Sequence, residues 1–316
     1  MLTKIRLGIS ACLLGEKVRF DGGHKWDHFI TGTLGKFVEL VPVCPEVECG
    51  LGIPREAMRL VASPEGPRLV TIRTRVDYSE RMGAWAQKRV VELEREDLCG
   101  FIFKSGSPSS GMERVKIYDG KGEPARTGVG MFAREFRQHF PLLPVEDEGR
   151  LHDPSLRENF LERLFTLKRW RETLSLGFQP GHLVDFHTRH KLLIRSHSPK
   201  HYALLGKLAA QLKEMDLPEV YEQYQNLLME ALRFKSTVKK NVDVLLHIMG
   251  YFKKNLSPAE KEELLEIIND YRQGYIPLIV PVTLLNHYVR KYDQAYLKAQ
   301  YYLDPHPLEL KLRNHV

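Results

Sequence analysis

Ile5-Arg6-Leu7-Gly8-Ile9-Ser10 is a short run of mostly apolar, partly β-branched residues, and Ala11-Cys12-Leu13-Leu14-Gly15 follows it directly. Such a run, ended by a glycine-containing turn, predicts a buried β-strand. The first residues lack the long apolar core and the small-residue cleavage site of a signal peptide. We therefore expect the N-terminus to enter the first domain directly, and we expect a cytoplasmic protein.

Further strand signals follow in the first half of the chain, and they alternate with one strong helical signal. The predicted strands are Ile5–Ser10, Phe37–Val43, Arg68–Ile72 and Gly100–Lys104. Between the last two, apolar residues recur every 3.6 positions from Tyr78 to about Glu96, which predicts an amphipathic helix. This alternation predicts an α/β domain with a central, mostly parallel sheet flanked by helices, and functional sites in such sheets lie where strands end.

The chain changes character around Pro141–Pro154, where prolines and the acidic run Glu146-Asp147-Glu148 indicate a connector. We expect one domain over residues 1–145 and a second, all-α domain over residues 154–316. The predicted helical segments are Leu156–Ser175, Gly181–Ser196, His201–Met215, Leu217–Asn255, Ala259–Gly274 and Ile279–Leu303. Ser257-Pro258-Ala259-Glu260 has the residues of a helix N-terminus, and Gly274 is typical of a helix end.

Composition narrows the classes of protein. The 316 residues are 43% hydrophobic, and no stretch approaches the roughly 20 apolar residues of a membrane span, so we expect no membrane partner. A formal charge of +7 is compatible with a polyanionic partner. No glycine-rich dinucleotide or phosphate-loop motif is present, so we expect no nucleotide cofactor.

Three of the four cysteines follow predicted strands in glycine- or proline-rich loops: Cys12, Cys44 and Cys49. In a reducing compartment, clustered cysteines are metal ligands or reactive groups more often than disulfides. Cys99 begins a hydrophobic strand, where a thiol is usually an inert core residue. Three ligands without an obvious fourth leave one coordination position open. Zinc, completed by His24 or Cys99, and an iron–sulfur cluster remain equally compatible with these residues.

The motifs of the first half closely resemble those of the thiouracil desulfidase (TudS) family. They are Ser10-Ala11-Cys12-Leu13-Leu14-Gly15, Val18-Arg19-Phe20-Asp21-Gly22-Gly23-His24, Pro42-Val43-Cys44-Pro45-Glu46 and Ser107-Pro108-Ser109-Ser110-Gly111. The second half is similar to the helical YbgA-like domain, in Asp185-Phe186-His187-Thr188-Arg189-His190-Lys191, His247-Ile248-Met249-Gly250-Tyr251-Phe252, Pro277-Leu278-Ile279-Val280-Pro281 and Tyr302-Leu303-Asp304-Pro305-His306-Pro307. The fusion resembles RudS-type proteins.

This resemblance implies a [4Fe–4S] cluster on three cysteines, whose open iron binds the thiocarbonyl sulfur. The implied reaction is hydrolytic removal of sulfur from a thiolated uracil, foremost 4-thiouridine in transfer RNA, with sulfide transferred to that iron. Glu46, two residues beyond Cys44, is the expected general base, and Ser109 hydrogen-bonds the ring or relays a proton. We assign substrate contacts to Asp21, Ser107 and Ser110.

One residue departs from the family pattern. The family motif usually has cysteine where this chain has Ser110, so a ligand is missing. We hypothesise that Cys49, from the neighbouring loop, supplies the third thiolate.

The helical half is rich in histidines interleaved with cations. His182, His187, His190, His197 and His201 alternate with Arg189, Lys191, Arg195, Lys200 and Lys207. This pattern favours an RNA-facing surface over a metal cluster, and we expect substrate contacts from His187 and Arg189. Two alternatives stay open: a zinc- or cluster-stabilised RNA-binding module without catalysis, and a desulfidase for free thiouracil only.

Overall fold

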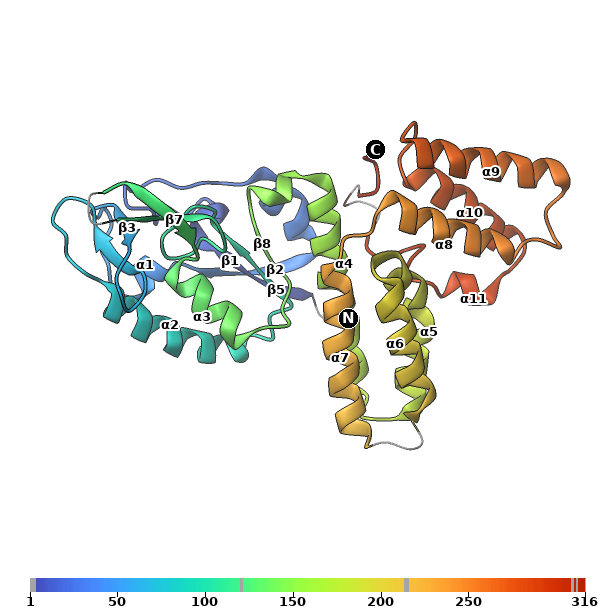
Figure 1. Ribbon diagram of the computed structural model, residues 1–316, viewed down its shortest axis with the longest axis horizontal. Helices are drawn as coiled ribbons and strands as arrows, with labels where there is room; N and C mark the ends of the chain where they lie inside the picture. The colour runs from blue at the N-terminus through green and yellow to red at the C-terminus, as the bar shows by residue number, and fades with distance from the viewer. Residues whose placement is uncertain (1–3, 120–121, 213–215, 308–309, 311, 316) are drawn as a thin grey trace. The chain divides into compact units, whose positions relative to one another are not determined.

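The computed structural model describes residues 4–119, 122–212, 216–307, 310 and 312–315. The chain divides into two compact units, Met1–Asp153 and Pro154–Val316. The first has a mostly parallel sheet flanked by helices, and the second is largely helical (Figure 1). The predicted fold class is confirmed.

Four parallel strands form the main sheet of the first unit, in the order β2-β1-β5-β8. Their bounds are Ile5–Ser10 for β1, Val38–Val43 for β2, Gly100–Phe103 for β5 and Val145–Asp147 for β8. β1 lies inside the sheet, with β2, the next strand along the chain, on one side and β5 on the other. The strand order therefore reverses beside β1, and ligands bind at such a position in open α/β sheets.

Gly8 in the middle of β1 is required by packing. A Cβ atom there would lie 2.3 Å from the Phe101 ring on the neighbouring strand β5. That ring belongs to a buried aromatic cluster, with Phe103 at 4.4 Å and Phe136 at 4.8 Å between ring centroids. The aromatic core thus reaches directly onto the central strand.

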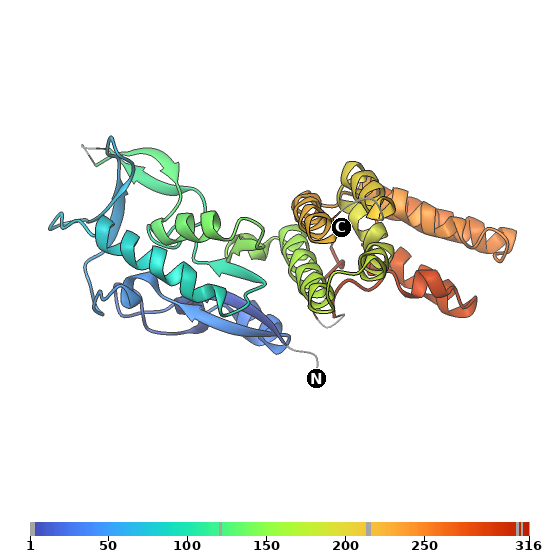
Figure 2. The ribbon, with the colours of Figure 1, turned by 90° about the horizontal axis from the view of Figure 1, so that it is seen from below.

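A second sheet has the order β4-β3-β6-β7, and of its strands the sequence predicted only β4, as Arg68–Ile72. Its strands are Met58–Val61 for β3, Arg68–Thr71 for β4, Val115–Tyr118 for β6 and Pro124–Gly128 for β7. The helices of the unit are α1 (Pro45–Glu48), α2 (Ser79–Glu94) and α3 (Met131–His139), with short helical turns at Ala11–Leu14, Phe29–Thr33, Leu34–Lys36 and Arg150–His152. α2 and α3 lie side by side (Figures 1 and 2).

The acidic run at the expected connector is part of the sheet. Glu146 and Asp147 are buried in β8, which pairs with β5. The connector interpretation is wrong for these residues, because Arg150 neutralises Glu146 through a 2.6 Å ion pair and lets the strand be buried.

The second unit contains eight helices within its described residues. They are α4 (Pro154–Ser175), α5 (Pro180–His197), α6 (Pro199–Ala210), α7 (Leu217–Arg233), α8 (Val238–Gly250), α9 (Pro258–Gln273), α10 (Ile279–Lys291) and α11 (Ala295–Lys298). The continuous helix predicted over Leu217–Asn255 is wrong. The chain turns extended at Phe234, and the Thr237 side chain then caps α8 by accepting from the Lys240 N–H.

The predicted start and end signals of one helix are confirmed. Ser257 and Glu260 form a capping box at the start of α9, and Gly274 ends it with a positive φ. His201–Met215 was predicted as one segment, and its last three residues lie outside the described ones. Among the described residues, none of the helices is both apolar enough and long enough to span a bilayer.

Candidate active site

The loops after the parallel strands enclose a cavity of about 360 Å³ in the first unit. Its lining comes from the segments that follow β1, β2 and β5, together with the start of β3. The Ser10 hydroxyl at the end of β1 accepts a 2.9 Å hydrogen bond from the Lys104 N–H at the end of β5. The cavity therefore lies at the edge of the sheet where the sequence predicted a site.

Two of the three predicted ligands, Cys12 and Cys44, line this cavity. Cys12 lies in the helical turn after β1, and Cys44 follows β2 and precedes Pro45 at the start of α1. Burial raises the pKa of the Cys12 thiol to about 11 and that of Cys44 to about 12. Both side chains would stay protonated at neutral pH unless a cation replaced the proton, which is how metal binding displaces thiol protons.

Glu46 and Ser109, the predicted catalytic pair, contact each other. The Ser109 hydroxyl donates a 2.5 Å hydrogen bond to Glu46 Oε1, and the Ser107 hydroxyl lies 2.9 Å from that of Ser109. Glu46 Oε2 lies 3.6 Å from the Cys44 Sγ. The carboxylate is thus held between a buried hydroxyl and a cavity thiol.

Cys49 and Ser110 occupy different environments. Cys49 is buried in an apolar cluster with residues such as Leu60 and Met82, and its thiol donates a 3.3 Å hydrogen bond to the Glu46 carbonyl oxygen. Ser110 lines the cavity, with its N–H bonded to the Ser107 hydroxyl at 3.1 Å. Within the described part of the chain, no three His, Cys, Asp or Glu side chains are grouped to hold a metal ion.

The chemistry of these side chains suits a soft metal centre. Two thiols share the wall of one cavity, and four cations line the same cavity, which would offset the negative charge of thiolates and of a cluster. A third thiol, Cys49, lies at the other end of the single-turn helix α1 from Cys44. The residues present therefore fit an iron–sulfur cluster if Cys49 turns toward the cavity.

The four cations are Arg19, Lys25, Arg55 and Lys104. Arg55 lies 3.8 Å from Glu46 Oε2 and donates to the Val18 carbonyl at 3.0 Å. Lys104 pairs with Glu148 at 2.5 Å. Sequence reasoning missed Arg55 and Lys104. Lys104 had a detectable signal, because it ends the predicted strand Gly100–Lys104 at the same sheet edge as Cys12 and Cys44, whereas nothing in the sequence marked Arg55.

Asp21 and Cys99 lie away from the cavity wall. Asp21 is exposed and accepts a 3.0 Å hydrogen bond from the Gly23 N–H, so it stabilises its own turn. Cys99 is buried just before β5, as expected of a core residue.

The helical unit uses several of its histidines internally, so the prediction of an RNA-facing histidine surface is wrong for three of them. His190, His197 and His201 are buried. His197 bonds Glu162 at 2.9 Å and the Phe234 carbonyl at 2.7 Å, which leaves no ring nitrogen for a ligand.

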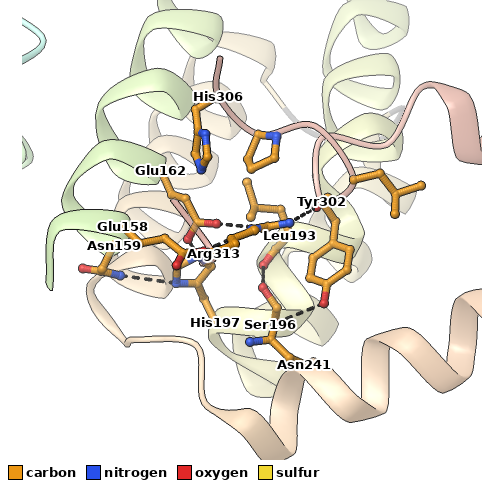
Figure 3. Close-up of polar contacts among 12 residues, drawn as sticks. Glu158, Asn159, Glu162, Leu193, Ser196, His197, Asn241, Tyr302, His306 and Arg313 are labelled. Carbon is orange, nitrogen blue, oxygen red and sulfur yellow. Dashed lines mark hydrogen bonds and ion pairs between the residues drawn. The ribbon is translucent and has the colours of Figure 1, made fainter. Parts of the chain in front are cut away.

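His197 belongs to a buried polar network (Figure 3). Arg313 near the C-terminus binds Glu158 at 3.0 Å and Glu162 at 2.9 Å, both on α4. His306 lies beside Glu162, and its Nε2 atom has no hydrogen-bond partner among the described residues. This network connects the C-terminal segment to α4 and α5.

The two predicted substrate contacts of this unit are on α5. His187 is half-buried and bonds the Tyr224 hydroxyl at 3.0 Å, and burial lowers its pKa to about 4. Arg189 is exposed and pairs with Asp185 at 2.9 Å. Neither residue lines the cavity of the first unit.

Comparisons with known proteins match each half separately. Residues 7–148 match the family model "2-thiouracil desulfurase", and residues 191–307 match a family described as protein of unknown function (DUF1722). The chain is 30% identical over 158 residues to the uncharacterized protein YbgA of Escherichia coli (strain K12), covering 50% of this chain and 94% of that protein. A solved structure, the [4Fe-4S]-dependent thiouracil desulfidase TudS, is 28% identical, with a TM-score of 0.39 over 49% of this chain and 98% of that one.

Proposed function

The chain belongs to the YbgA family and carries a 2-thiouracil desulfurase domain over residues 7–148, and on that premise we propose that it removes sulfur from thiolated uracil, as 4-thiouridine in transfer RNA. The observation that supports this most is that Cys12, Cys44 and Glu46 line the same cavity. It lies at the strand ends, where α/β domains bind small ligands.

Cys12 and Cys44 would hold a [4Fe–4S] cluster, with Cys49 as the third thiolate. Bound there, the cluster supplies an open iron, a soft Lewis acid suited to a thiocarbonyl sulfur. Arg55 and Lys104, on the same cavity wall, offset negative charge.

Glu46 is the general base that takes a proton from the attacking water. Its Oε1 is occupied by the Ser109 hydroxyl, which fixes the carboxylate and leaves Oε2 near Cys44 Sγ. Ser107, bonded to Ser109, extends a hydroxyl chain along which a proton can move. The reaction changes no oxidation state, so these groups need only move protons and water.

The RNA part of the proposal is supported by charge. The formal net charge of +7 and a pI near 9.1 suit a polyanion better than a neutral base. Exposed cations of the helical unit, including Arg189, would contact phosphates. Free thiouracil is the second candidate substrate, favoured by the small cavity volume.

The cysteine exchange is tested by metal content. Cys49→Ser should lose iron and acid-labile sulfide, whereas Cys99→Ser, another buried cysteine, should keep both. Ser110→Ala should also keep them. If Cys49→Ser retains a full cluster and Ser110→Ala loses it, the serine is the third ligand and the exchange is wrong.

A further inference from the structure

Two exposed aromatic side chains follow the Cys12 turn, and one of them, Phe20, lines the cavity. Phe20 is 41% exposed and Trp26 is 51% exposed, although both belong to the segment that follows the Cys12 turn. Single exposed apolar residues are ordinary on protein surfaces. Two large rings within seven residues, one of them in the cavity wall, form a more specific feature.

Backbone hydrogen bonds anchor the chain on which both rings stand. The residues on either side of Trp26 donate to the Cys12 turn: the Lys25 N–H to the Cys12 carbonyl at 2.8 Å and the Asp27 N–H to the Leu13 carbonyl at 3.0 Å. The Phe20 carbonyl accepts from the Arg55 N–H at 2.9 Å. The rings are therefore presented by a fixed backbone, and their exposure does not come from an unanchored loop.

Cations accompany the rings. The Arg19 guanidinium lies 5.5 Å from the centre of the Phe20 ring, and Lys25, adjacent to Trp26, lines the cavity. Two acidic residues lie in the same segment: Asp21 pairs with the Arg19 guanidinium at 3.6 Å and accepts from the Gly23 N–H, and the buried Asp27 accepts from the Ile30 N–H at 2.9 Å. Aromatic rings beside cations are the usual surface for single-stranded nucleic acid, whose bases stack on the rings while phosphates meet the cations.

We propose that Phe20 and Trp26 stack the nucleobases that flank the thiolated nucleotide, so that the enzyme acts on an unpaired stretch of RNA. This rests on the proposed desulfidase function. Trp26 does not line the cavity, so a free base bound in the cavity would not contact this ring. An RNA strand that continues past the cavity would contact it. A nucleotide inside a duplex has to be unstacked first, which costs free energy that flanking stacks recover.

Trp26→Ala tests the proposal through two substrates, a short single-stranded RNA with one 4-thiouridine and the 4-thiouridine nucleoside. The ratio of the KM for RNA to the KM for the nucleoside should rise about 5- to 150-fold, the range that corresponds to one lost base stack. Val91→Ala on α2, where the side chain is 52% exposed, is the matched control and should leave the ratio unchanged. An unchanged ratio in Trp26→Ala, or an equal rise in both KM values, would overturn the proposal.

A binding measurement separates this proposal from catalysis. An oligonucleotide with uridine in place of 4-thiouridine should quench tryptophan fluorescence of the wild-type chain and bind Trp26→Ala more weakly. Trp26→Phe keeps a stacking ring and should retain most of the affinity, which guards against misfolding of the alanine variant. If no substrate is desulfurated but this pattern appears, the proposed function fails and the stacking surface stands. Equal oligonucleotide affinity in all three proteins would refute the stacking surface.

Discussion

At the scale of single residues, the arrangement around Glu46 determines what the cavity can do. One carboxylate oxygen accepts from Ser109, and the other faces the Cys44 thiol and the Arg55 guanidinium. A carboxylate that lines the cavity and is fixed by Ser109 on one side is suited to accept a proton from water bound beside it.

Glu46→Gln removes the proposed base but keeps the size of the side chain. The amide oxygen can still accept from Ser109, so the fold and the metal content should be unchanged, while turnover falls about 10²- to 10⁴-fold. Steady-state kinetics together with iron analysis measure both. Glu65→Gln, an exposed loop carboxylate, is the control. Near-normal turnover in Glu46→Gln would remove the base role.

Most cavity residues that could be predicted from sequence directly follow strands. Cys12, Cys44 and Glu46 come just after β1 and β2, and parallel strands end at a common edge. Arg55 could not be predicted, because it reaches Glu46 through a loop whose path depends on tertiary packing. The position of the Cys49 thiol could not be predicted either. Its spacing from Cys44 does not determine which way the side chain points at the end of a short helix.

At the scale of elements, helix α3 positions the serine loop. The Gly130 N–H donates to the Gly111 carbonyl at 2.8 Å, and the Ala133 N–H to the Ser109 carbonyl at 3.2 Å. The backbones touch here: a Cβ atom on Gly130 would lie 2.6 Å from the Ser109 carbonyl carbon. Ser109 is thus held by helix α3, which begins 22 residues further along the chain.

Gly130→Ala should therefore displace Ser109 from Glu46. We expect a protein that still folds but has lower turnover and reduced stability, because backbone atoms have to shift to admit the methyl group. Gly32→Ala is the matched control, since nothing lies within 4 Å of a Cβ atom there. Turnover and the urea unfolding midpoint measure the two effects. Wild-type values in Gly130→Ala would show that the contact does not position the serine.

Buried histidines make the helical unit sensitive to acid. Burial lowers the pKa of His187 and that of His306 to about 4, below their ordinary value of 6.5. The unfolded chain then binds more protons than the folded one between about pH 6.5 and pH 4. The histidines' contribution to stability is complete above the unfolded pKa and is lost as the pH falls through this window.

We expect the urea midpoint of the helical unit to drop from pH 7 toward pH 4, with a shallower drop in His187→Asn. The asparagine side chain can bond Tyr224 but does not titrate. His182→Asn, at a partly exposed position of the same helix, should keep the wild-type slope. Equal slopes in all three proteins would contradict the assignment.

The sequence predicted the elements of the main sheet better than those of the second sheet. Ile5–Ser10 is a mostly apolar run and Gly100–Phe103 a continuous one, as expected of strands that are largely buried. β6 and β7 are short strands separated by a turn at Asp119, so their hydrophobic pattern was not distinctive of strands. In the helical unit, the break between α7 and α8 was missed because apolar residues continue at helical spacing on both sides of it.

At the scale of the whole molecule, the chain combines two units with separate relatives. Residues 7–148 carry the desulfurase domain and its cavity, and residues 191–307 match a family without assigned function. Under the proposed function, exposed cations of the second unit would hold an RNA strand, so we predict an enzyme whose preferred substrate is a thiolated nucleotide within RNA.

The most direct test is to purify the full chain anaerobically, measure iron and sulfide, and follow the thiouridine absorbance of transfer RNA that contains 4-thiouridine. We predict a cluster with iron and sulfide in equal amounts and loss of the thiouridine absorbance during incubation. Zinc or no metal, with the transfer RNA bound but unchanged, would contradict it and leave an RNA-binding protein without this chemistry.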